Sequence, residues 1–381
     1  MSTVVFVGLR AGALDAAERL GLAAVAVTEA TPGAGRRARL AGHVWADFGA
    51  PPAAWGVVAR GLRAHRPAAV VALTERSVAP AAHLRAALGL DGLSVEAARV
   101  CTDKRAMKRA ARAAGLRCAD VVEAEDGLPA DGLVERLGLP LVVKPAVGSG
   151  GRGARVCRSR AEVPDALPPG WMAESFVAGV EMSVETIAGP GDEGGAVWAN
   201  PTRYVVPTWA SLVPAPPGPA VAAAVALAVE ARAALGVERG VTHLEAFLTP
   251  DGPAFGEMAA RPPGGHLMAL ARLAYGADPW EAALRVELGE PHGLPARAER
   301  AAAAWILHPG AGQVTRAEGV AACRALPGVA EVALRVAPGD TVGPRTGSGE
   351  EVGHVLVTGA TAAEAEARVR AARDALHVEV G

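Results

Sequence analysis

The sequence predicts an α/β domain with a doubly wound parallel sheet, followed by a longer region of α+β character. Its first residues support the parallel sheet: an apolar, β-branched stretch at 3–8 precedes a helical pattern at 12–20 and a second apolar stretch at 23–27. Strands and helices continue to alternate up to about residue 94, which is typical of a parallel sheet. Beyond this point the strands, including a hairpin at about 241–260, indicate antiparallel pairing.

The length of 381 residues and these changes in pattern predict three domains. We expect an N-terminal α/β domain at 1–94, a central domain at 95–300 and a C-terminal α+β domain at 301–381. Further helices are expected at 55–65, 78–88, 103–114, 221–235 and 362–376. Further strands are expected at 69–73, 139–145, 154–158, 171–177, 180–188, 303–308, 329–336 and 352–358, with turns at 338–340 and 347–349.

Composition and charge exclude several classes of protein. A formal net charge of -2 gives no basic field for nucleic acid, and an aromatic content of 4% offers no platform for stacked bases. No apolar stretch approaches the roughly 20 residues that a membrane-spanning helix needs. The four cysteines lie far apart without a CxxC pair, so neither a disulfide framework nor a zinc site is indicated. We expect a cytoplasmic protein that binds neither nucleic acid nor membranes.

The basic residues are strongly biased toward arginine, because 35 of the 38 are Arg and 3 are Lys. An ammonium group is a compact point charge, whereas a guanidinium is a planar fork. A lysine retained against this bias is therefore a candidate functional cation. We assign such a role to Lys104 and Lys144, and we interpret Lys108 as a lysine retained by chance.

A glycine-rich loop at 148–153 follows the strand that carries Lys144. Successive backbone N–H groups in such a loop can form an anion-binding concavity, and glycine lets a phosphate approach closely. The loop is not a Walker A motif, because no GK[ST] sequence occurs and a strand follows it. The alternative is a mobile hairpin tip, although a tip needs fewer glycines. We predict that the loop binds phosphate.

Two acidic residues face each other in the predicted hairpin. If the turn is centred on Asp251, Glu245 lies opposite Glu257 and Phe247 lies opposite Phe255. Two carboxylates so placed would repel each other, and a divalent cation is the simplest remedy, since Mg²⁺ is typically held by one or two carboxylates and substrate phosphates. Arg261 lies on the same face and could bind an anion beside the metal. The alternatives are a solvated acidic face or a shifted register that separates the acids.

A fourth segment, residues 172–185, has alternating acids around a Gly turn and by itself is typical of a solvated hairpin. In combination, however, four segments occur in the order found in ATP-grasp ligases. They are the helix with Lys104, the strand with Lys144 and its glycine-rich loop, this segment, and the hairpin with Glu245 and Glu257. The resemblance covers roughly residues 95–300. The first 94 residues are similar to the N-terminal domain of that superfamily, and the last 80 resemble the C-terminal domain of L-amino acid ligases.

The resemblance implies an ATP-grasp fold with the nucleotide between two subdomains of the central domain. It also implies ATP and Mg²⁺, with Mn²⁺ as an alternative, as cofactors. Arg261 would steady the acyl phosphate, and Glu245 and Glu257 would bind the metal. The residues implied for nucleotide binding are Lys104, Lys144, Gly148, Ser149, Gly150, Gly151, Arg152, Glu174, Phe176, Val177 and Glu181.

One position departs from the family pattern. Many ATP-grasp enzymes have Asn two residues after the second metal-binding Glu, whereas this chain has Ala259, which would weaken a second metal site. Some branches of the L-amino acid ligases resemble this chain in having an Ala-like residue at this position, so we interpret Ala259 as a mark of a subfamily. The following Gly264, Gly265 and His266 are expected to border the acceptor pocket, although His266 fits an ordinary helix start equally well.

The reaction that the resemblance implies joins a small-molecule carboxylate to an amine through an acyl phosphate, with release of ADP and phosphate. The oligomeric state stays open between a monomer and a homodimer, and dimers are common among relatives. Two alternatives stay open: a carboxylase of the biotin or purine type that activates bicarbonate, and a nucleotide-binding sensor without turnover. A nicotinamide dehydrogenase built on the first 90 residues is discarded, because it depends on the weak glycine pattern after Gly8 alone.

Overall fold

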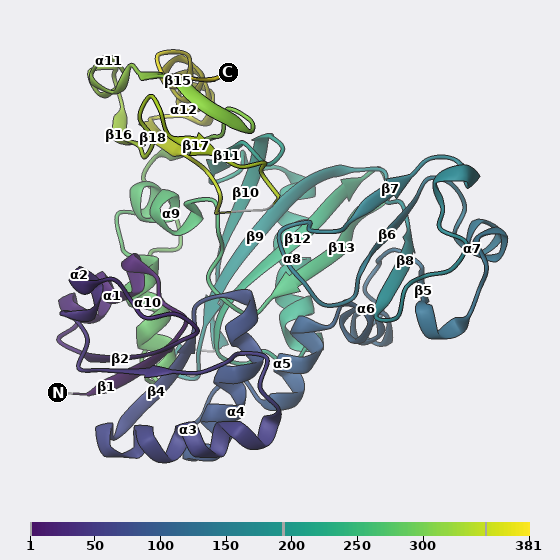
Figure 1. Cartoon of the computed structure of the whole chain (residues 1–381), viewed down its shortest axis with the longest axis horizontal. Helices are drawn as coiled ribbons and strands as arrows, with labels where there is room; N and C mark the ends of the chain where they lie inside the picture. The colour runs from purple at the N-terminus through teal and green to yellow at the C-terminus, as the bar shows by residue number, and fades with distance from the viewer. Residues whose placement is uncertain (1, 193–194, 347–348) are drawn as a thin grey trace.

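The computed structural model describes residues 2–192, 195–346 and 349–381. The chain begins with the predicted parallel sheet, whose strands lie in the order β3-β2-β1-β4 (Figure 1). The strand bounds are Thr3–Val7 (β1), Ala23–Thr28 (β2), Gly42–Trp45 (β3) and Pro67–Ala72 (β4). The α-helices of this part are Ala11–Arg19 (α1), Ala34–Arg37 (α2), Trp55–Leu62 (α3) and Val78–Leu88 (α4).

A four-stranded antiparallel sheet, in the order β5-β8-β6-β7, forms the small lobe on the right of Figure 1. Two helices lead into it, and the side chains of Ser94 and Asp103 cap their N-termini by accepting backbone N–H bonds. These helices are Val95–Thr102 (α5) and Lys104–Ala113 (α6). The lobe consists of Val121–Glu123 (β5), Ala130–Leu137 (α7), Leu141–Pro145 (β6), Arg155–Cys157 (β7) and Trp171–Ser175 (β8).

The largest sheet has eight strands in the order β13-β12-β9-β10-β11-β14-β18-β16. Every adjacent pair is antiparallel, as the sequence pattern predicts for the central region. The sheet passes through the predicted domain boundary at 300/301, because β11 pairs directly with β14. Its strands are Val180–Ala188 (β9), Trp198–Val206 (β10), Ala210–Val213 (β11), Gly240–Thr249 (β12), Gly252–Ala259 (β13), Ala301–Leu307 (β14), Val329–Leu334 (β16) and Gly353–Gly359 (β18).

The C-terminal part adds a three-stranded sheet, β17-β15-β19, which lies at the top of Figure 1. Of the expected turns, 347–349 lies partly outside the described residues. No described helix is both long enough and apolar enough to cross a bilayer. The remaining elements are Pro219–Ala234 (α8), Leu267–Tyr275 (α9), Pro279–Glu287 (α10), Gly312–Glu318 (β15), Val320–Arg324 (α11), Thr341–Val342 (β17), Ala362–Asp374 (α12) and His377–Val380 (β19).

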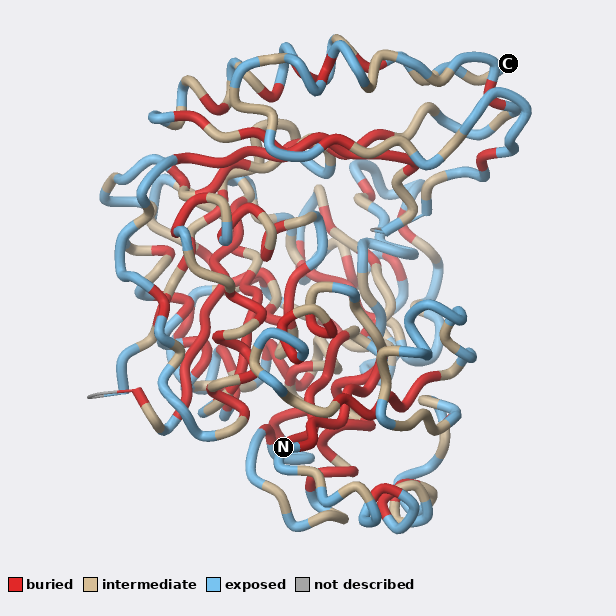
Figure 2. The backbone as a smooth tube through the Cα atoms, turned by 90° about the vertical axis from the view of Figure 1, so that its left-hand side faces the viewer, coloured by how far each residue is buried: buried red, intermediate tan, exposed pale blue. Residues whose placement is uncertain are grey.

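The two faces of the large sheet differ in polarity near β9, β12 and β13. Successive side chains of a strand point to opposite faces, so residues two apart share one face. One face carries buried apolar side chains that pack with helix α8, and the tube in Figure 2 is red through this central part of the molecule. The opposite face carries most of the acidic residues that the sequence singles out. This asymmetry positions the candidate site.

Candidate nucleotide and metal site

The polar face of the large sheet carries the acidic hairpin. Glu245 of β12 lies directly opposite Glu257 of β13, as predicted. The predicted pairing of Phe247 with Phe255 is wrong, however, because Phe247 pairs with Ala254 and Ala246 with Phe255.

The physical reason for this difference is a bulge. The turn is one residue tighter than predicted, because Thr249 pairs with Gly252, and the bulge at Gly256 restores the register before Glu257. The bulge turns Phe255 into the apolar core, where it is fully buried. A Cβ atom on Gly256 would lie 2.6 Å from the Glu245 carbonyl oxygen, so only glycine fits there without a shift.

The donor set fits a divalent cation held by two carboxylates. Burial and then the charge of Glu245 raise the pKa of Glu257. Burial acts to raise the pKa of Glu245 too, but the hydrogen bond and charge of His243 lower it overall. No group of three or more metal-binding side chains was found among the described residues. Two carboxylates completed by substrate phosphates are a common way to hold Mg²⁺, whereas a cation held by protein ligands alone needs more donors.

All three lysines of the chain meet beside this pair. We call Lys104, Lys108 and Lys144, together with Glu174 and Glu257, the lysine cluster. Lys104 Nζ donates to the Gly148 carbonyl oxygen at 2.7 Å and lies 3.5 Å from Glu257 Oε2. Lys144 forms a short hydrogen bond with Glu174 Oε1. The cluster thus joins the small lobe, the glycine-rich loop and the large sheet.

Lys108 is the residue whose assignment the structure changes. Its side chain is 3% exposed, its Nζ lies 3.4 Å from Glu174 Oε2, and it donates to the Phe255 carbonyl oxygen at 3.3 Å. Burial lowers its pKa, and the charge of Glu174 opposes this shift. Lys108 thus has a buried carboxylate partner, which the interpretation as a lysine retained by chance does not account for.

Glu174 is the counter-ion of two lysines. Burial acts to raise its pKa, but Lys108 and Lys144 lower the pKa overall, so the carboxylate stays ionised. Two further residues that the resemblance implies for nucleotide binding follow along the chain, with Phe176 40% exposed and Val177 half-buried. Glu181, on the polar face of β9, has its pKa raised to about 7 by burial and by the charges of Glu245 and Glu257.

His243 connects the acidic hairpin to a buried polar network. Its Nδ1–H donates to Glu185 Oε1 at 2.9 Å, and its Nε2 lies 3.5 Å from Glu245 Oε1. Hydrogen bonds and charge from these two carboxylates outweigh burial and raise the His243 pKa to about 9. Ala259 lies directly opposite His243 in the strand register. This chain therefore places the methyl group of Ala259 beside the imidazole of His243.

The glycine-rich loop faces the lysine cluster with a backbone that suits anions. Gly148, Gly150, Gly151 and Gly153 have positive φ, and a Cβ on Gly148 or Gly151 would meet no atom within 4 Å. Such a backbone can turn consecutive N–H groups toward a phosphate. Arg152 lies in the same loop, where its Nη2 donates to Glu350 Oε1 of the C-terminal part at 3.1 Å.

The predicted substrate residues lie at two places. Arg261 Nε donates to Glu75 Oε2 of the N-terminal domain at 2.9 Å. His266 adopts a left-handed conformation with φ 62°, stacks on His354 at 3.9 Å between ring centroids and lies 3.4 Å from Glu351 Oε1. Gly264 and Gly265 are exposed in the loop between them. His266 thus links the start of α9 to the C-terminal strands.

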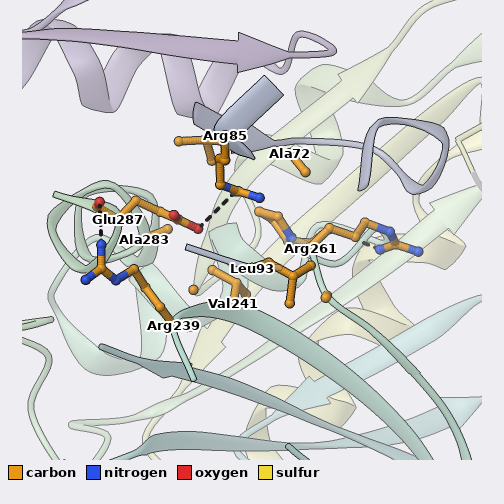
Figure 3. A pocket seen from close by; sticks show the side chains of 12 residues that line it. Ala72, Arg85, Leu93, Arg239, Val241, Arg261, Ala283 and Glu287 are labelled. Atoms are coloured by element: carbon orange, nitrogen blue, oxygen red, sulfur yellow. Dashed lines mark hydrogen bonds and ion pairs between the residues drawn. The ribbon is translucent and has the colours of Figure 1, made fainter. Parts of the chain in front are cut away.

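A second buried charge cluster lies behind Arg261, and most of its residues line a small cavity of about 20 Å³ (Figure 3). We call Arg85, Arg232 and Arg239, with Glu287, the arginine cluster. Arg85 Nη2 lies 3.6 Å from Glu287 Oε1, and Arg239 donates to the Glu287 carbonyl oxygen at 3.4 Å. Arg85 Nε and Nη1 have no hydrogen-bond partner among the described residues, and the cavity is large enough for one water molecule.

Two family models match the chain: "L-amino acid ligase C-terminal domain 2" at residues 304–381 and "Carbamoyl-phosphate synthase L chain, ATP binding domain" at residues 103–184. The crystal structure of an L-amino acid ligase from Bacillus licheniformis superposes with a TM-score of 0.83 at 22% identity, covering 100% of this chain and 99% of that one. The chain has the ATP-grasp fold and is similar to L-amino acid ligases. The resemblance inferred from the motifs is therefore confirmed.

Three other proteins are similar to this chain. The L-arginine-specific L-amino acid ligase of Bacillus subtilis is 27% identical over 242 residues, covering 58% of this chain and 57% of that protein. A curated relative from Sinorhizobium fredii is 27% identical over 305 residues, which cover 75% of this chain and 63% of that protein. The chain therefore spans about three fifths of the length of each of these two relatives. A biotin carboxylase domain from Hydrogenobacter thermophilus, determined with MgADP and bicarbonate, gives a TM-score of 0.70 at 16% identity, covering 99% of this chain and 90% of that one.

Proposed function

We propose that the chain is an ATP-dependent carboxylate–amine ligase that forms an amide or peptide bond on amino-acid-like substrates and releases ADP and phosphate. One observation carries the proposal: all three lysines of an arginine-rich chain pair with carboxylates close to the facing acids. Lys104 lies between Glu257 and the glycine-rich loop, and Lys108 and Lys144 share Glu174. A nucleotide triphosphate with its divalent cation matches this arrangement of charge, because lysine ammonium groups suit phosphate oxygens as point charges.

The nucleotide would lie between the small lobe and the large sheet. The loop N–H groups, Lys104 and Lys144 would contact the phosphates, and Arg152 would leave Glu350 to reach the outermost one. The backbone of Phe176 and Val177 would contact adenine, and Glu181 would bind the ribose hydroxyls. Glu174 would hold Lys144 and Lys108 in place, since its carboxylate already pairs with both.

Glu245 and Glu257 would hold Mg²⁺, or Mn²⁺ as an alternative. When bound, the cation supplies positive charge that offsets the repulsion between the two carboxylates and between the phosphates. His243 keeps Glu245 ionised through its own positive charge and is in turn held by Glu185.

In the first step, an oxygen of the substrate carboxylate attacks the γ-phosphorus of ATP, the bond to the bridging oxygen breaks, and ADP leaves. In the second step, the nitrogen of a neutral amine attacks the acyl carbon, inorganic phosphate leaves, and the amine loses a proton. Arg261 would neutralise the acyl phosphate oxygens. The protein contributes mainly position and charge, and the glycine-rich loop would exclude water from an intermediate that hydrolyses readily.

The proposal is tested by product analysis with Mg-ATP. The protein is incubated with pooled amino acids, with amino acids plus a second amine, and with bicarbonate in a separate reaction. We expect ADP and phosphate in the two reactions with amino acids, which supply both a carboxylate and an amine, and none with bicarbonate. ADP that depends on bicarbonate would favour the carboxylase, AMP would overturn the acyl phosphate mechanism, and no turnover in any reaction would contradict the ligase assignment.

A further inference from the structure

A buried carboxylate lies next to the acidic hairpin. Glu185 of β9 accepts hydrogen bonds from four donors that come from three strands. Its Oε1 accepts from Ser183 Oγ at 2.8 Å and from His243 Nδ1–H at 2.9 Å. Its Oε2 accepts from Asn200 Nδ2 and from Thr202 Oγ1, both at 2.7 Å. A carboxylate has about four acceptor positions, so four donors hold this one from every side.

The register of the large sheet places this network beside the proposed metal ligands. Glu185 lies opposite Asn200 of β10 on one side and opposite His243 of β12 on the other. Two residues further along β12, Glu245 lies opposite Glu257. Residues two apart on a strand share one face, so both rows project from the same side of the sheet. Strand pairing alone therefore brings the network next to the two carboxylates.

The exposure of these side chains falls with distance from the hairpin. The side chains of Glu245 and Glu257 are 36% and 30% exposed, so burial alone does not fix their conformations. Those of His243 and Glu185 are 10% and 4% exposed. His243 Nε2 lies 3.5 Å from Glu245 Oε1, and its Nδ1–H is bound to Glu185. The imidazole thus connects a partly exposed carboxylate to a buried one that is held in place.

Asn200 is the single asparagine of the chain, and it is fully buried. Its Nδ2 donates to Glu185 Oε2 and lies 3.3 Å from Thr202 Oγ1, whereas its Oδ1 has no hydrogen-bond partner among the described residues. A buried amide oxygen without a partner is unfavourable. An apolar residue would avoid this cost but would leave Glu185 with one donor fewer. The bond to Glu185 therefore explains why an amide is kept at this position.

We propose that Glu185 is a positioning residue for the cation held by Glu245 and Glu257, and that Asn200 fixes its orientation. The chain of contacts from Asn200 through Glu185 and His243 sets the conformation of Glu245 and hence the affinity for the cation. Groups that orient metal ligands in this way contribute roughly 10- to 100-fold to metal affinity. This inference rests on the metal site of the proposed function. A network that only joined β9, β10 and β12 would contribute to stability and leave the metal affinity of the folded protein unchanged.

The test is Glu185→Gln, because an amide accepts hydrogen bonds at one end only and would oppose the donors at the other. Binding of Mn²⁺ in the presence of ADP is followed by electron paramagnetic resonance of the free ion, which requires no turnover. We expect the Kd of Mn²⁺ to rise at least about tenfold. Asn200→Ala removes one of the four donors and should raise the Kd by a smaller factor. Thermal unfolding without metal shows whether each variant is folded.

Thr242→Val is the matched control. Thr242 lies opposite Thr186 in the same strand pair, and their hydroxyl groups share a buried hydrogen bond on the other face of the sheet. This variant should lose stability but keep its affinity for Mn²⁺. An unchanged Kd in Glu185→Gln, or the same loss of affinity in Thr242→Val, would overturn the inference. If Glu185→Gln does not fold, Asn200→Ala decides, because an unchanged Kd in that variant would refute the inference as well.

Failure of the proposed function looks different. A wild type that binds no Mn²⁺ with ADP would refute the metal assignment, and the inference with it. A wild type that binds Mn²⁺ but joins no acid to an amine would refute the ligase reaction, while the Kd values of the variants would still decide the role of Glu185.

Discussion

The lysine cluster lies between the small lobe and the large sheet, and the arginine cluster lies where the N-terminal domain meets the large sheet. Both group cations with carboxylates, but their bonding differs. In the arginine cluster, Arg232 donates to the carbonyl oxygens of Gly240 and Ala188, and Arg239 donates to that of Glu287. In the lysine cluster, two of the three ammonium groups share one carboxylate, Glu174. The arginines are held mainly by fixed backbone, whereas the lysines are held mainly by carboxylates and a loop.

This difference indicates why the chain keeps its three lysines. A guanidinium has five donors in a rigid fork, which suits several carbonyl oxygens around it. An ammonium on a flexible stem can turn from a carboxylate to a phosphate as the nucleotide binds. We infer that the arginine cluster stabilises the domain junction and that the lysine cluster serves the ligand. The following predictions test this division.

The largest effect is expected for Glu257→Gln. Loss of one of the two carboxylates proposed to hold the metal should lower ADP formation by at least about 100-fold, comparable to the loss of a strong electrostatic contact in an active site. The folded protein should not lose stability, because the raised pKa of Glu257 means that its charge is unfavourable in the fold. ADP release and thermal unfolding measure the two effects. Full ATP turnover in this variant would refute the metal assignment.

Glu287→Gln in the arginine cluster should show the opposite behaviour. It leaves buried guanidinium groups without their carboxylate, which should lower the free energy of unfolding by about 3 kcal/mol. The KM for ATP should change little. Urea unfolding measures the loss, and Glu290→Gln, which removes an exposed partner of Arg285, should change it by less than about 1 kcal/mol. A Glu287→Gln variant that keeps its stability but binds ATP weakly would contradict the inference that the arginine cluster serves stability and the lysine cluster serves the ligand.

Gly256→Ala tests whether the bulge sets the site. The added Cβ would lie 2.6 Å from the Glu245 carbonyl oxygen and should force the hairpin to shift, at a cost of about 1–3 kcal/mol. Metal affinity should fall with it, which a Mn²⁺ titration can follow. Gly56→Ala, at a helical position with open space, is the control and should keep both properties. Unchanged metal affinity in Gly256→Ala would show that the register does not depend on this glycine.

Lys144→Arg compares the two kinds of cation directly. The charge is kept, but the planar fork cannot replace the compact charge that pairs with Glu174, so the KM for ATP should rise about tenfold. Arg99→Lys, at an exposed ion pair on α5, serves as the control and should have no effect. Normal ATP binding by the Lys144→Arg variant would contradict the interpretation of the lysine bias.

The smallest effect concerns the link between α9 and the C-terminal strands. The hydrogen bond from His266 lowers the pKa of Glu351 to about 2. The ionised form of Glu351 therefore stabilises the fold at pH values above the ordinary glutamate pKa. This contribution to stability is lost as the pH falls from about 4.5 to 2. The difference in unfolding free energy between wild type and Glu351→Gln should shrink over this range. A constant difference would contradict the pKa assignment.

Much of this arrangement follows from local sequence pattern. Alternation of strand and helix predicts the parallel sheet, and the hairpin acids predict the Glu245–Glu257 pair. The predicted pairing is correct although the predicted turn is not, because a tighter turn and the Gly256 bulge compensate each other. Such compensation depends on packing of Phe255 in the core, which pattern alone does not reveal. The burial of Lys108, the Glu75–Arg261 contact and strands β10 and β11 likewise depend on tertiary contacts between distant segments.

The most direct test of the ligase mechanism is transfer of oxygen from the donor carboxylate to phosphate. The donor acid, labelled with ¹⁸O in its carboxylate, is incubated with Mg-ATP and the amine, and the inorganic phosphate is examined by mass spectrometry. An acyl phosphate intermediate predicts one ¹⁸O atom in the released phosphate and ADP as the nucleotide product. Phosphate without label, or AMP that carries the label, would contradict the account.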